Sequence, residues 1–443
     1  MNLIENKQNY LFKKAKLFLS YLKFLKIDTS KSSFCYINTY SETPGYGMIL
    51  LWLKSQGYIL KIIKIFIINI FKITNYSEFF LINYKKQKFN KIIMTWGNKK
   101  DFRNKIFYDK FSNIKSCDLK NAIFFVVYLE TQLPKIIPEN VVILFNNNKK
   151  SFFFLIKKFF KILKEFGLSF NKCFHYFSSQ TIFAEIVNSN LSVLIGKNKI
   201  EKIVMPYEGQ PFQNFVFKNL KEKFIDIKTI GFVHSMIPAL PLNYIRRDGS
   251  PDKIFLSGNS QKNLFLKYLG WKKNQISVKD SIRIKKKIHP NQFNSIFFAI
   301  LLNNIYEISR KFNQYLISLS AKSLPVIKIK THPAISNSKI QLLLKKKIKK
   351  YIVDNKVKFS KKNKCRKSFH IGPTSTFLQY LENNNHVIHF TADPILDVYS
   401  HKFWRKIKPF KLDEHIYSYR LEAKNQILQL SNKNFNIIKA GII

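Results

Sequence analysis

Short apolar runs alternate with amphipathic stretches along most of the chain. Runs such as Ala122–Tyr128 and Thr229–Val233 have the length and the apolar composition of buried strands. Phe177–Leu194, between two such runs, has the length and the apolar spacing of a helix. Strands that alternate with helices are typical of the α/β class, so the pattern predicts parallel sheets with helices packed on them.

The same alternation occurs in both halves of the chain. In the first half we expect strands at Ser33–Asn38, Tyr58 onward, Ile92–Thr95, Ala122–Tyr128, Val141–Phe145, Lys202–Met205, Thr229–Val233, Lys253–Ser257 and Ile276–Val278, with helices at Met48–Ser55, Phe177–Leu194 and Gln261–Leu269. In the second half we expect strands at Ser295–Leu302, Pro325–Lys330, Phe369–Gly372 and Val387–Phe390, with helices at Tyr306–Leu319 and Ser375–Glu382.

A chain of 443 residues exceeds one ordinary hydrophobic core. We therefore predict two Rossmann-like domains that face a cleft, at residues 1–285 and 291–410, followed by a helical tail at 411–443. The charged stretch Arg283–His289, closed by Pro290, is the expected hinge. Ligands of such sheets bind outside the carboxyl ends of the strands.

The charge is strongly positive, with 76 Lys and Arg against 26 Asp and Glu and a formal net charge of +50. Such an excess favours nucleic acid or an acidic membrane surface as a partner. No groove-reading or base-stacking module is recognisable, which disfavours nucleic acid. Lysines beside Phe and Ile in Tyr58–Lys72 and Phe152–Phe166 suit the inner face of a bilayer. An equally good explanation of the positive charge is that the lysines are solvated surface residues in a composition typical of an AT-rich genome.

Several features favour a peripheral, cytoplasmic location. No uncharged apolar run reaches the roughly 18 residues of a spanning helix, and the first residues lack the apolar core of a signal peptide. The cysteines form no Cys-X-X-Cys pair, so neither a disulfide framework nor a metal site is indicated. They are Cys35, Cys117, Cys173 and Cys365.

Two polar segments follow strands in the second half. His332-Pro333 ends one strand, and the loop Gly372–Thr376 ends another and opens a helix. Backbone N–H groups and hydroxyls at a helix start bind anions, and an imidazole adds a hydrogen bond or a proton. A plain His-Pro turn and ordinary helix capping are the alternatives. The predicted nucleotide-binding residues are Lys330, His332, Pro333, Gly372, Thr374, Ser375, Thr376 and Glu382, the last for a ribose hydroxyl.

Glu208 is the candidate catalytic base, because it follows the strand Lys202–Met205 in a chain with few carboxylates. A carboxylate in a strand-end loop can take a proton from an attacking hydroxyl, and partial burial would raise its pKa toward neutrality. The alternative role for Glu208 is to cap a helix, and the alternative for His234 is to pack as a histidine in the core. The predicted substrate-binding residues are Gln210, Gln213, His234, Ser235 and Arg283.

The familiar cofactor and metal motifs are absent from the sequence. There is no glycine-rich dinucleotide fingerprint, no P-loop, no zinc-protease motif and no Asp-X-Asp pair. We therefore expect neither a cofactor nor a metal ion. A transfer without metal needs other positive groups on the leaving nucleotide, and His332, Lys330 and the helix start are the expected ones.

Residues 200–390 resemble bacterial surface-carbohydrate biosynthesis proteins of the GT-B glycosyltransferase type, such as sialyltransferases and capsular polysialyltransferases. Tyr207-Glu208-Gly209 is similar to their acidic-acidic-Gly motif but has Tyr at the leading acidic position. Lys330-Thr331-His332-Pro333 matches their His-Pro motif, and Thr374-Ser375-Thr376 resembles their Ser/Thr motif.

This resemblance implies a GT-B-like fold and a metal-independent, inverting glycosyltransferase. It implies Glu208 as the general base, His332 as the group that assists the departing phosphate, and Ser375 and Thr376 as phosphate ligands. The donor would be a nucleotide-sugar, with a CMP-sugar favoured, and the acceptor a cell-surface or lipid-linked glycan. A CDP-glycerol glycerophosphotransferase and a non-catalytic protein that binds polyanions or nucleic acid are the alternatives.

Overall fold

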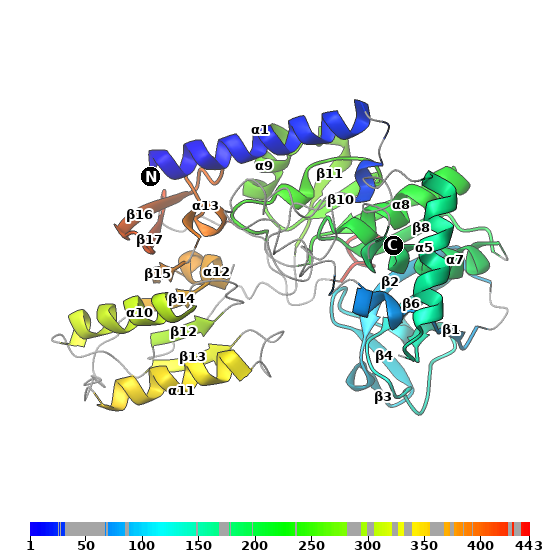
Figure 1. Cartoon of the computed structure of the whole chain (residues 1–443), viewed down its shortest axis with the longest axis horizontal. Helices are drawn as coiled ribbons and strands as arrows, with labels where there is room; N and C mark the ends of the chain where they lie inside the picture. The colour runs from blue at the N-terminus through cyan, green and yellow to red at the C-terminus, as the bar shows by residue number, and fades with distance from the viewer. Residues whose placement is uncertain are drawn as a thin grey trace.

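The chain forms a mixed α/β structure with a large, mostly parallel sheet (Figure 1). The α/β class predicted from the alternation of strands and helices is confirmed. The computed structural model describes residues 1–24, 26, 28–31, 67, 70–84, 88–147, 149–167, 177, 179–196, 198–234, 237–280, 294–298, 305–320, 327–331, 339–354, 367–372, 376–383, 385–391, 393–423, 428 and 436–443.

An eight-stranded sheet forms the larger half, in the order β1-β7-β6-β2-β8-β9-β10-β11. Only its edge strand β1 runs antiparallel, against β7. The seven residues of β6 are all buried, as expected for a central strand covered on both faces. The strands are β1 Phe79–Ile82, β2 Lys91–Gly97, β6 Ala122–Tyr128, β7 Val141–Asn146, β8 Lys202–Pro206, β9 Lys228–Phe232, β10 Lys253–Leu256 and β11 Ile276–Val278.

A second sheet of six strands has the order β13-β12-β14-β15-β17-β16. Its first four strands are parallel to one another, and β17 and β16 continue it in antiparallel orientation. The strands are β12 Asn294–Phe298, β13 Ile327–Thr331, β14 Lys367–Ile371, β15 His386–Phe390, β16 Ile407–Asp413 and β17 Ile416–Leu421.

The end of the chain differs from the sequence prediction. We expected a helical tail from 411, but β16 and β17 form a hairpin there that extends the six-stranded sheet. Residues 411–414 (KLDE) carry no apolar pattern from which a strand could be recognised. The hairpin is held instead by the pairing of β17 with β15, so the prediction of a helix is wrong. Ile437 and Ile442 then pack in a core cluster with residues of the eight-stranded sheet.

A small three-stranded sheet follows β2 and was not predicted. Its strands β3 Phe102–Arg103, β4 Ile106–Asp109 and β5 Ile114–Lys115 are too short to show a periodic pattern. Asp109 is fully buried, and it accepts hydrogen bonds from Thr95 Oγ1 at 2.8 Å and from the backbone N–H of Phe111 at 3.1 Å. These bonds fix the turn that carries Phe111, and burial raises the pKa of the Asp109 carboxyl.

Helices cover the two sheets and connect the halves. The predicted helices over 177–194, 261–269, 306–319 and 375–382 are present within a few residues. The predicted strand–helix–strand unit at 33–58 and the predicted hinge at 283–289 lie outside the described residues. The helices are α1 Asn2–Phe24, α5 Phe152–Phe166, α7 Ser179–Ile195, α8 Pro211–Lys223, α9 Asn259–Tyr268, α10 Ile305–Ser320, α11 Lys339–Asp354, α12 Thr376–Glu382 and α13 Pro394–Asp397.

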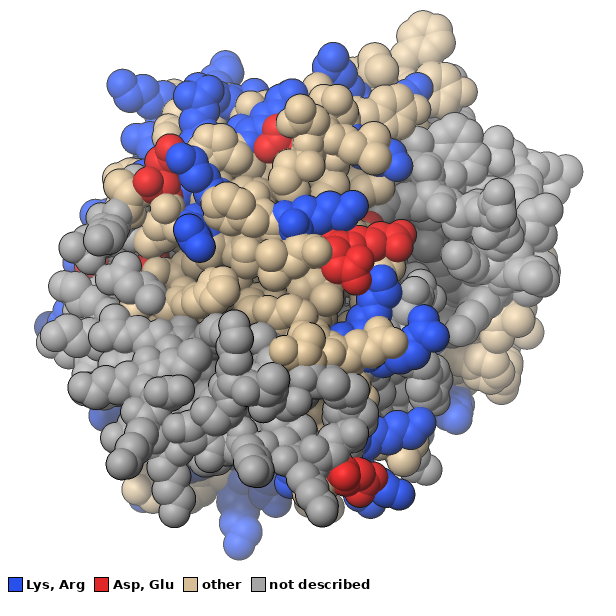
Figure 2. Space-filling view, turned by 90° about the vertical axis from the view of Figure 1, so that its left-hand side faces the viewer, with Lys and Arg blue, Asp and Glu red and all other residues tan. Residues whose placement is uncertain are grey.

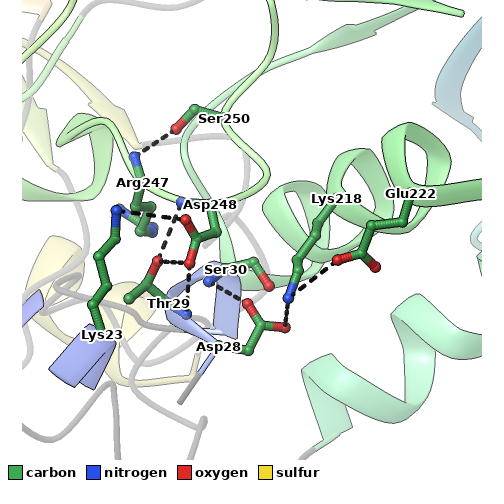
Figure 3. Close-up of polar contacts among 9 residues, drawn as sticks. All are labelled: Lys23, Asp28, Thr29, Ser30, Lys218, Glu222, Arg247, Asp248 and Ser250. Atoms are coloured by element: carbon green, nitrogen blue, oxygen red, sulfur yellow. Dashed lines mark hydrogen bonds and ion pairs between the residues drawn. The ribbon is translucent and has the colours of Figure 1, made fainter. Parts of the chain in front are cut away.

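Helix α1 lies along both halves of the molecule (Figure 1). Gln8 near its start donates to the carbonyl oxygens of Ile395 and Val398, both at 2.8 Å, on the side of the six-stranded sheet. At its other end, Lys23 lies 3.6 Å from the carboxylate of Asp248. The same carboxylate accepts a 2.7 Å hydrogen bond from the hydroxyl of Thr29 (Figure 3). Because both ends are anchored, α1 ties the two halves together.

Two buried histidines lie on neighbouring strands of the six-stranded sheet. His389 Nε2 donates to the carbonyl oxygen of Gly372 at 2.9 Å, and Nδ1 faces the Tyr419 hydroxyl at 3.2 Å. His370 Nε2 lies 3.0 Å from Ser368 Oγ. Burial lowers the pKa of His389 to about 4, and burial with the nearby His389 lowers the pKa of His370 well below its ordinary value.

These histidines predict a loss of stability in mild acid. In the unfolded chain a histidine titrates near pH 6.5, roughly, so from there down to about pH 4 the unfolded state binds more protons than the folded state. The free energy of unfolding is therefore highest above pH 6.5 and falls as the pH drops, by about 3 kcal/mol for His389 alone. Urea unfolding between pH 7 and pH 4 measures this change. His389→Gln should flatten the pH dependence, and an unchanged slope in this variant would contradict the assignment.

Candidate functional site

The order of strands in the eight-stranded sheet reverses between β2 and β8. From β2 the chain proceeds to β6 and β7 on one side, and it then returns to place β8, β9, β10 and β11 on the other side. In parallel sheets such a reversal leaves a crevice at the carboxyl ends of the two strands, where ligands bind. Glu208 is the second residue after β8 and therefore lies close to this reversal point.

The carboxylate of Glu208 has two side-chain partners. Gln210 Nε2 donates to Oε2 at 2.6 Å, and His234 Nε2 lies 3.4 Å from Oε1. His234 follows β9, the neighbouring strand, so two adjacent strand ends bring this pair together. The Glu208 side chain is 30% exposed and that of His234 only 7%. The carboxylate is thus oriented from within the protein while part of it faces solvent.

Gln213 shapes the loop that carries Glu208. Its Oε1 accepts the backbone N–H groups of Glu208 at 2.9 Å and of Gln210 at 3.1 Å, and its Nε2 donates to Pro206 O at 2.7 Å. The side chain is 1% exposed. We expected Gln213 to contact substrate, but its polar atoms face the backbone of its own loop, so its role here is to brace that loop.

A buried arginine holds the same loop from the other side. Arg247 donates through NH2 to the carbonyl oxygen of Gly209 at 2.7 Å, and through NH1 to those of Asn243 at 2.8 Å and Ile245 at 3.1 Å. Burial lowers the pKa of Arg247 to about 10, which still leaves it charged at neutral pH. Several carbonyl dipoles aimed at one guanidinium compensate for part of its desolvation.

Tyr207, which stands at the leading acidic position of the resembled motif, points into the core. It is fully buried, and its hydroxyl donates to Asn214 Oδ1 at 2.7 Å. Strand alternation explains this, since neighbouring side chains leave opposite faces of the chain. Tyr207 therefore supports α8, and Glu208 is the residue of this motif that reaches the carboxyl edge of the sheet.

A small pocket adjoins His234 at the carboxyl ends of β9, β10 and β11. Phe111 packs edge-on against the imidazole, with ring centroids 4.9 Å apart. The buried turn around Asp109 holds Phe111 in this position. The pocket is lined by Phe111, Phe232, Val233, His234, Phe255, Leu256, Ser257, Lys279, Asp280 and Ile442.

Gly372 occupies the equivalent position in the six-stranded sheet. There the chain places β13 on one side of β12 and then β14 and β15 on the other, so the order reverses between β12 and β14. Gly372 follows β14 directly and has a φ of +84°, a conformation that glycine adopts without strain. Its N–H donates to Phe390 O at 2.8 Å, and its carbonyl accepts from His389 at 2.9 Å. Both contacts fix the start of the loop.

Several predicted nucleotide-binding and substrate-binding residues have no described side chain. Lys330 lies in β13 and Thr376 is the first residue of α12, but their side chains are outside the description. Glu382 lies at the opposite end of α12 from Gly372, and its carboxylate accepts the backbone N–H of Leu428 at 2.6 Å. The predicted residues outside the described part of the chain are Ser235, Arg283, His332, Pro333, Thr374 and Ser375.

Direct contacts join the two sheets near both reversal points. The Tyr399 hydroxyl donates to Ile237 O at 2.7 Å, and Trp404 Nε1 donates to Ala239 O at 2.9 Å. Ile237 lies three residues after His234. On the other side, Phe377 of α12 packs edge-on against Tyr399 with ring centroids 4.8 Å apart. The loop after β9 and the helix after Gly372 are therefore joined through Tyr399.

The part of the chain that the structure describes holds no candidate metal cluster and no candidate membrane-spanning helix. No three His, Cys, Asp or Glu side chains come together there as metal ligands. None of the helices in that part combines the length and the apolar character needed to cross a bilayer. Comparison with protein-family models and with curated protein sequences finds no match for this chain.

Two residues of the site were missed by the sequence interpretation. Arg247 lies in a turn, Arg246-Arg247-Asp248-Gly249, in which arginines stand out in a chain that otherwise uses lysine. That contrast was the available signal, because the planar guanidinium serves several fixed acceptors better than an ammonium does. No sequence pattern indicated Phe111, because its position beside His234 depends on how the three-stranded sheet packs in the folded protein.

Gly209 provides a stability test of the loop. Gly209 and Gly441 have φ angles of +67° and +66°, but a Cβ at Gly209 would lie 2.2 Å from Asn243 O while nothing lies within 4 Å at Gly441. Gly441→Ala should cost about 1 kcal/mol of unfolding free energy through backbone strain alone. Gly209→Ala should cost about 3 kcal/mol or more, because the loop must also move away from the backbone of Asn243. Urea unfolding measures both, and equal losses would show that the loop is not tightly packed.

Proposed function

We propose that the protein is a metal-independent, inverting glycosyltransferase with a GT-B-like arrangement of its two sheets. The proposal is carried by one observation. The strand order reverses at β8 in the eight-stranded sheet and at β14 in the six-stranded sheet, and Glu208 and Gly372 follow these two strands, respectively. Two such positions, on halves of the molecule that Tyr399 joins, fit an enzyme that binds an acceptor on one sheet and a nucleotide-activated donor on the other.

Glu208 is the proposed general base. Its carboxylate takes the proton of an acceptor hydroxyl as the hydroxyl oxygen attacks the anomeric carbon of the donor sugar. A new C–O bond forms on one face of the sugar while the bond to the nucleotide phosphate breaks on the other, so the configuration inverts. The phosphate leaves with the electron pair of that bond, and the proton stays on Glu208 until it passes to solvent.

His234 and Gln210 are the proposed positioning groups for this base. Their nitrogen atoms lie 3.4 Å and 2.6 Å from the two carboxylate oxygens. These contacts hold the carboxylate in one orientation, which a base that takes a proton from a hydroxyl requires. The pocket beside His234, with Phe111, Phe255 and Lys279 in its lining, offers apolar surface and a cation where an acceptor sugar would lie.

The leaving nucleotide is assigned to the six-stranded sheet. Gly372 allows the backbone to approach a phosphate closely because it has no side chain there. Lys330 and His332, at the end of β13, are the proposed positive groups that offset charge on the departing phosphate. We propose Ser375 and Thr376 as phosphate ligands, and a CMP-sugar as the donor.

Replacement of the base tests the proposal. Glu208→Gln keeps the size and the hydrogen-bonding shape of the side chain but cannot accept a proton. We expect kcat to fall by about 10²- to 10⁴-fold, in line with the usual contribution of a general base. The measurement is nucleotide release from a panel of CMP-, UDP- and GDP-sugars in the presence of glycan acceptors. A thermal-shift titration with CMP, CDP, UDP and GDP should give the same response in the variant as in the parent protein.

The matched control is Glu222→Gln on α8, which removes an exposed carboxylate that pairs with Lys218 at 3.5 Å. This variant should keep full activity and the same nucleotide response. Undiminished turnover in Glu208→Gln would remove Glu208 from the mechanism. A thermal shift with CDP alone, together with transfer of glycerol phosphate from CDP-glycerol, would instead identify a glycerophosphotransferase.

A further inference from the structure

Helix α5 presents an unusual number of large apolar side chains to solvent. Phe152, Phe153 and Phe160 are 60%, 76% and 62% exposed, and Ile156 is 50% exposed. At 100° per residue these four side chains fall within about one quarter of the helix circumference. They form one stripe along α5 rather than isolated exposed residues, and such a contiguous patch usually marks a binding surface.

The opposite side of α5 attaches the helix to the protein. Ile162 is 5% exposed and packs in a cluster with Ile73 and Ile182, the latter on α7. Lys158 lies 2.9 Å from the carboxylate of Glu185, also on α7. Figure 1 shows α5 beside α7 on the outside of the larger half. The apolar stripe therefore faces away from both sheets on a helix that is already held in place.

Lysines border the apolar stripe on one side. Lys157, Lys161 and Lys164 are all exposed, and helical spacing places them next to Phe153 and Phe160. Lys150, just before the helix, is exposed as well, whereas Lys149 pairs with Glu78 at 3.3 Å. Glu165 is the one acidic residue of α5. The surface thus combines aromatic side chains with a dense positive border.

Some lysines elsewhere on the molecule are paired with carboxylates. On the face shown in Figure 2, lysine and arginine side chains are scattered among acidic residues and residues of other kinds. Lys311 lies 3.2 Å from Asp413, and Lys408 lies 2.8 Å from Glu422. Paired lysines of this kind contribute little attraction for an external anion.

We propose that α5 is a membrane-docking helix that lies in the headgroup region of an anionic phospholipid bilayer. Its phenylalanines would enter the acyl boundary, and Lys157, Lys161 and Lys164 would contact the acidic headgroups. The charge of the patch is complementary to such a surface, and the net charge of +50 adds long-range attraction. The surface lies on α5, which carries none of the residues of the candidate site, so this inference does not depend on the proposed activity.

Vesicle sedimentation tests the apolar stripe. Phe153→Gln/Phe160→Gln should reduce binding to vesicles of equal parts phosphatidylglycerol and phosphatidylcholine at least tenfold, because two aromatic rings no longer enter the bilayer. The matched control, Ile225→Gln/Val353→Gln, removes two apolar side chains outside α5 that are 89% and 72% exposed, and it should bind like the parent protein. All four positions are exposed, so thermal melting should confirm that both variants remain folded.

The positive border has a separate test. Lys157→Gln/Lys161→Gln/Lys164→Gln should weaken binding to the same vesicles by about a hundredfold at low salt, since each lysine contributes roughly a factor of five near an anionic surface. Pure phosphatidylcholine vesicles should bind the parent protein weakly. Equal binding to both kinds of vesicle would contradict the role of charge.

Three outcomes would overturn the assignment. Loss of binding in Leu3→Gln/Leu17→Gln, with binding kept in the α5 variants, would place the docking surface on α1, where these leucines are 66% and 63% exposed. Binding to single-stranded RNA that depends on the lysines but not on Phe153 and Phe160, without vesicle binding, would identify a nucleic-acid surface. Equal loss in the Ile225→Gln/Val353→Gln control would mean unspecific adsorption. Glu208→Gln should bind vesicles normally whether or not it abolishes turnover.

Discussion

The buried guanidinium of Arg247 is the interaction on which the candidate site depends. It donates hydrogen bonds to the carbonyl oxygens of Gly209, Asn243 and Ile245, and so joins the loop after β8 to the turn that precedes β10. A buried positive charge is costly unless polar groups surround it, and the carbonyl dipoles supply that compensation. The geometry of the Glu208 loop is therefore tied to a charge that cannot leave its position without a large loss of stability.

The neighbouring residue extends this constraint across the molecule. Asp248 binds Thr29 and Lys23 at the end of α1, and α1 in turn reaches the six-stranded sheet through Gln8 (Figure 3). A second connection runs through Tyr399 to the loop after β9. The two halves are thus joined by α1 and by the contacts of Tyr399 with the loop after β9 and with Phe377 of α12.

Elements with a strong local pattern of apolar residues were predicted well from the sequence, and elements with a weak pattern were missed. The run Ala122–Tyr128 predicts β6 residue for residue, because a strand buried on both faces must be continuously apolar. β16 was missed because it is largely exposed and carries no alternation, and its pairing with β17 is what makes it a strand. β3 and β5, with two residues each, are below the length at which a pattern can be recognised.

The sequence by itself determined the α/β class, the succession of most strands and helices, and the position of Glu208 immediately after a strand. Only the tertiary structure decided that Glu208 lies where the strand order reverses, that His234 and Arg247 orient its loop, and that Gln213 braces it. The amphipathic pattern of α5 likewise predicted a helix but not which of its apolar residues stay exposed. Local patterns record the contacts of a residue with its near neighbours in the chain, whereas strand order, burial and ion pairing are set by segments far apart in sequence.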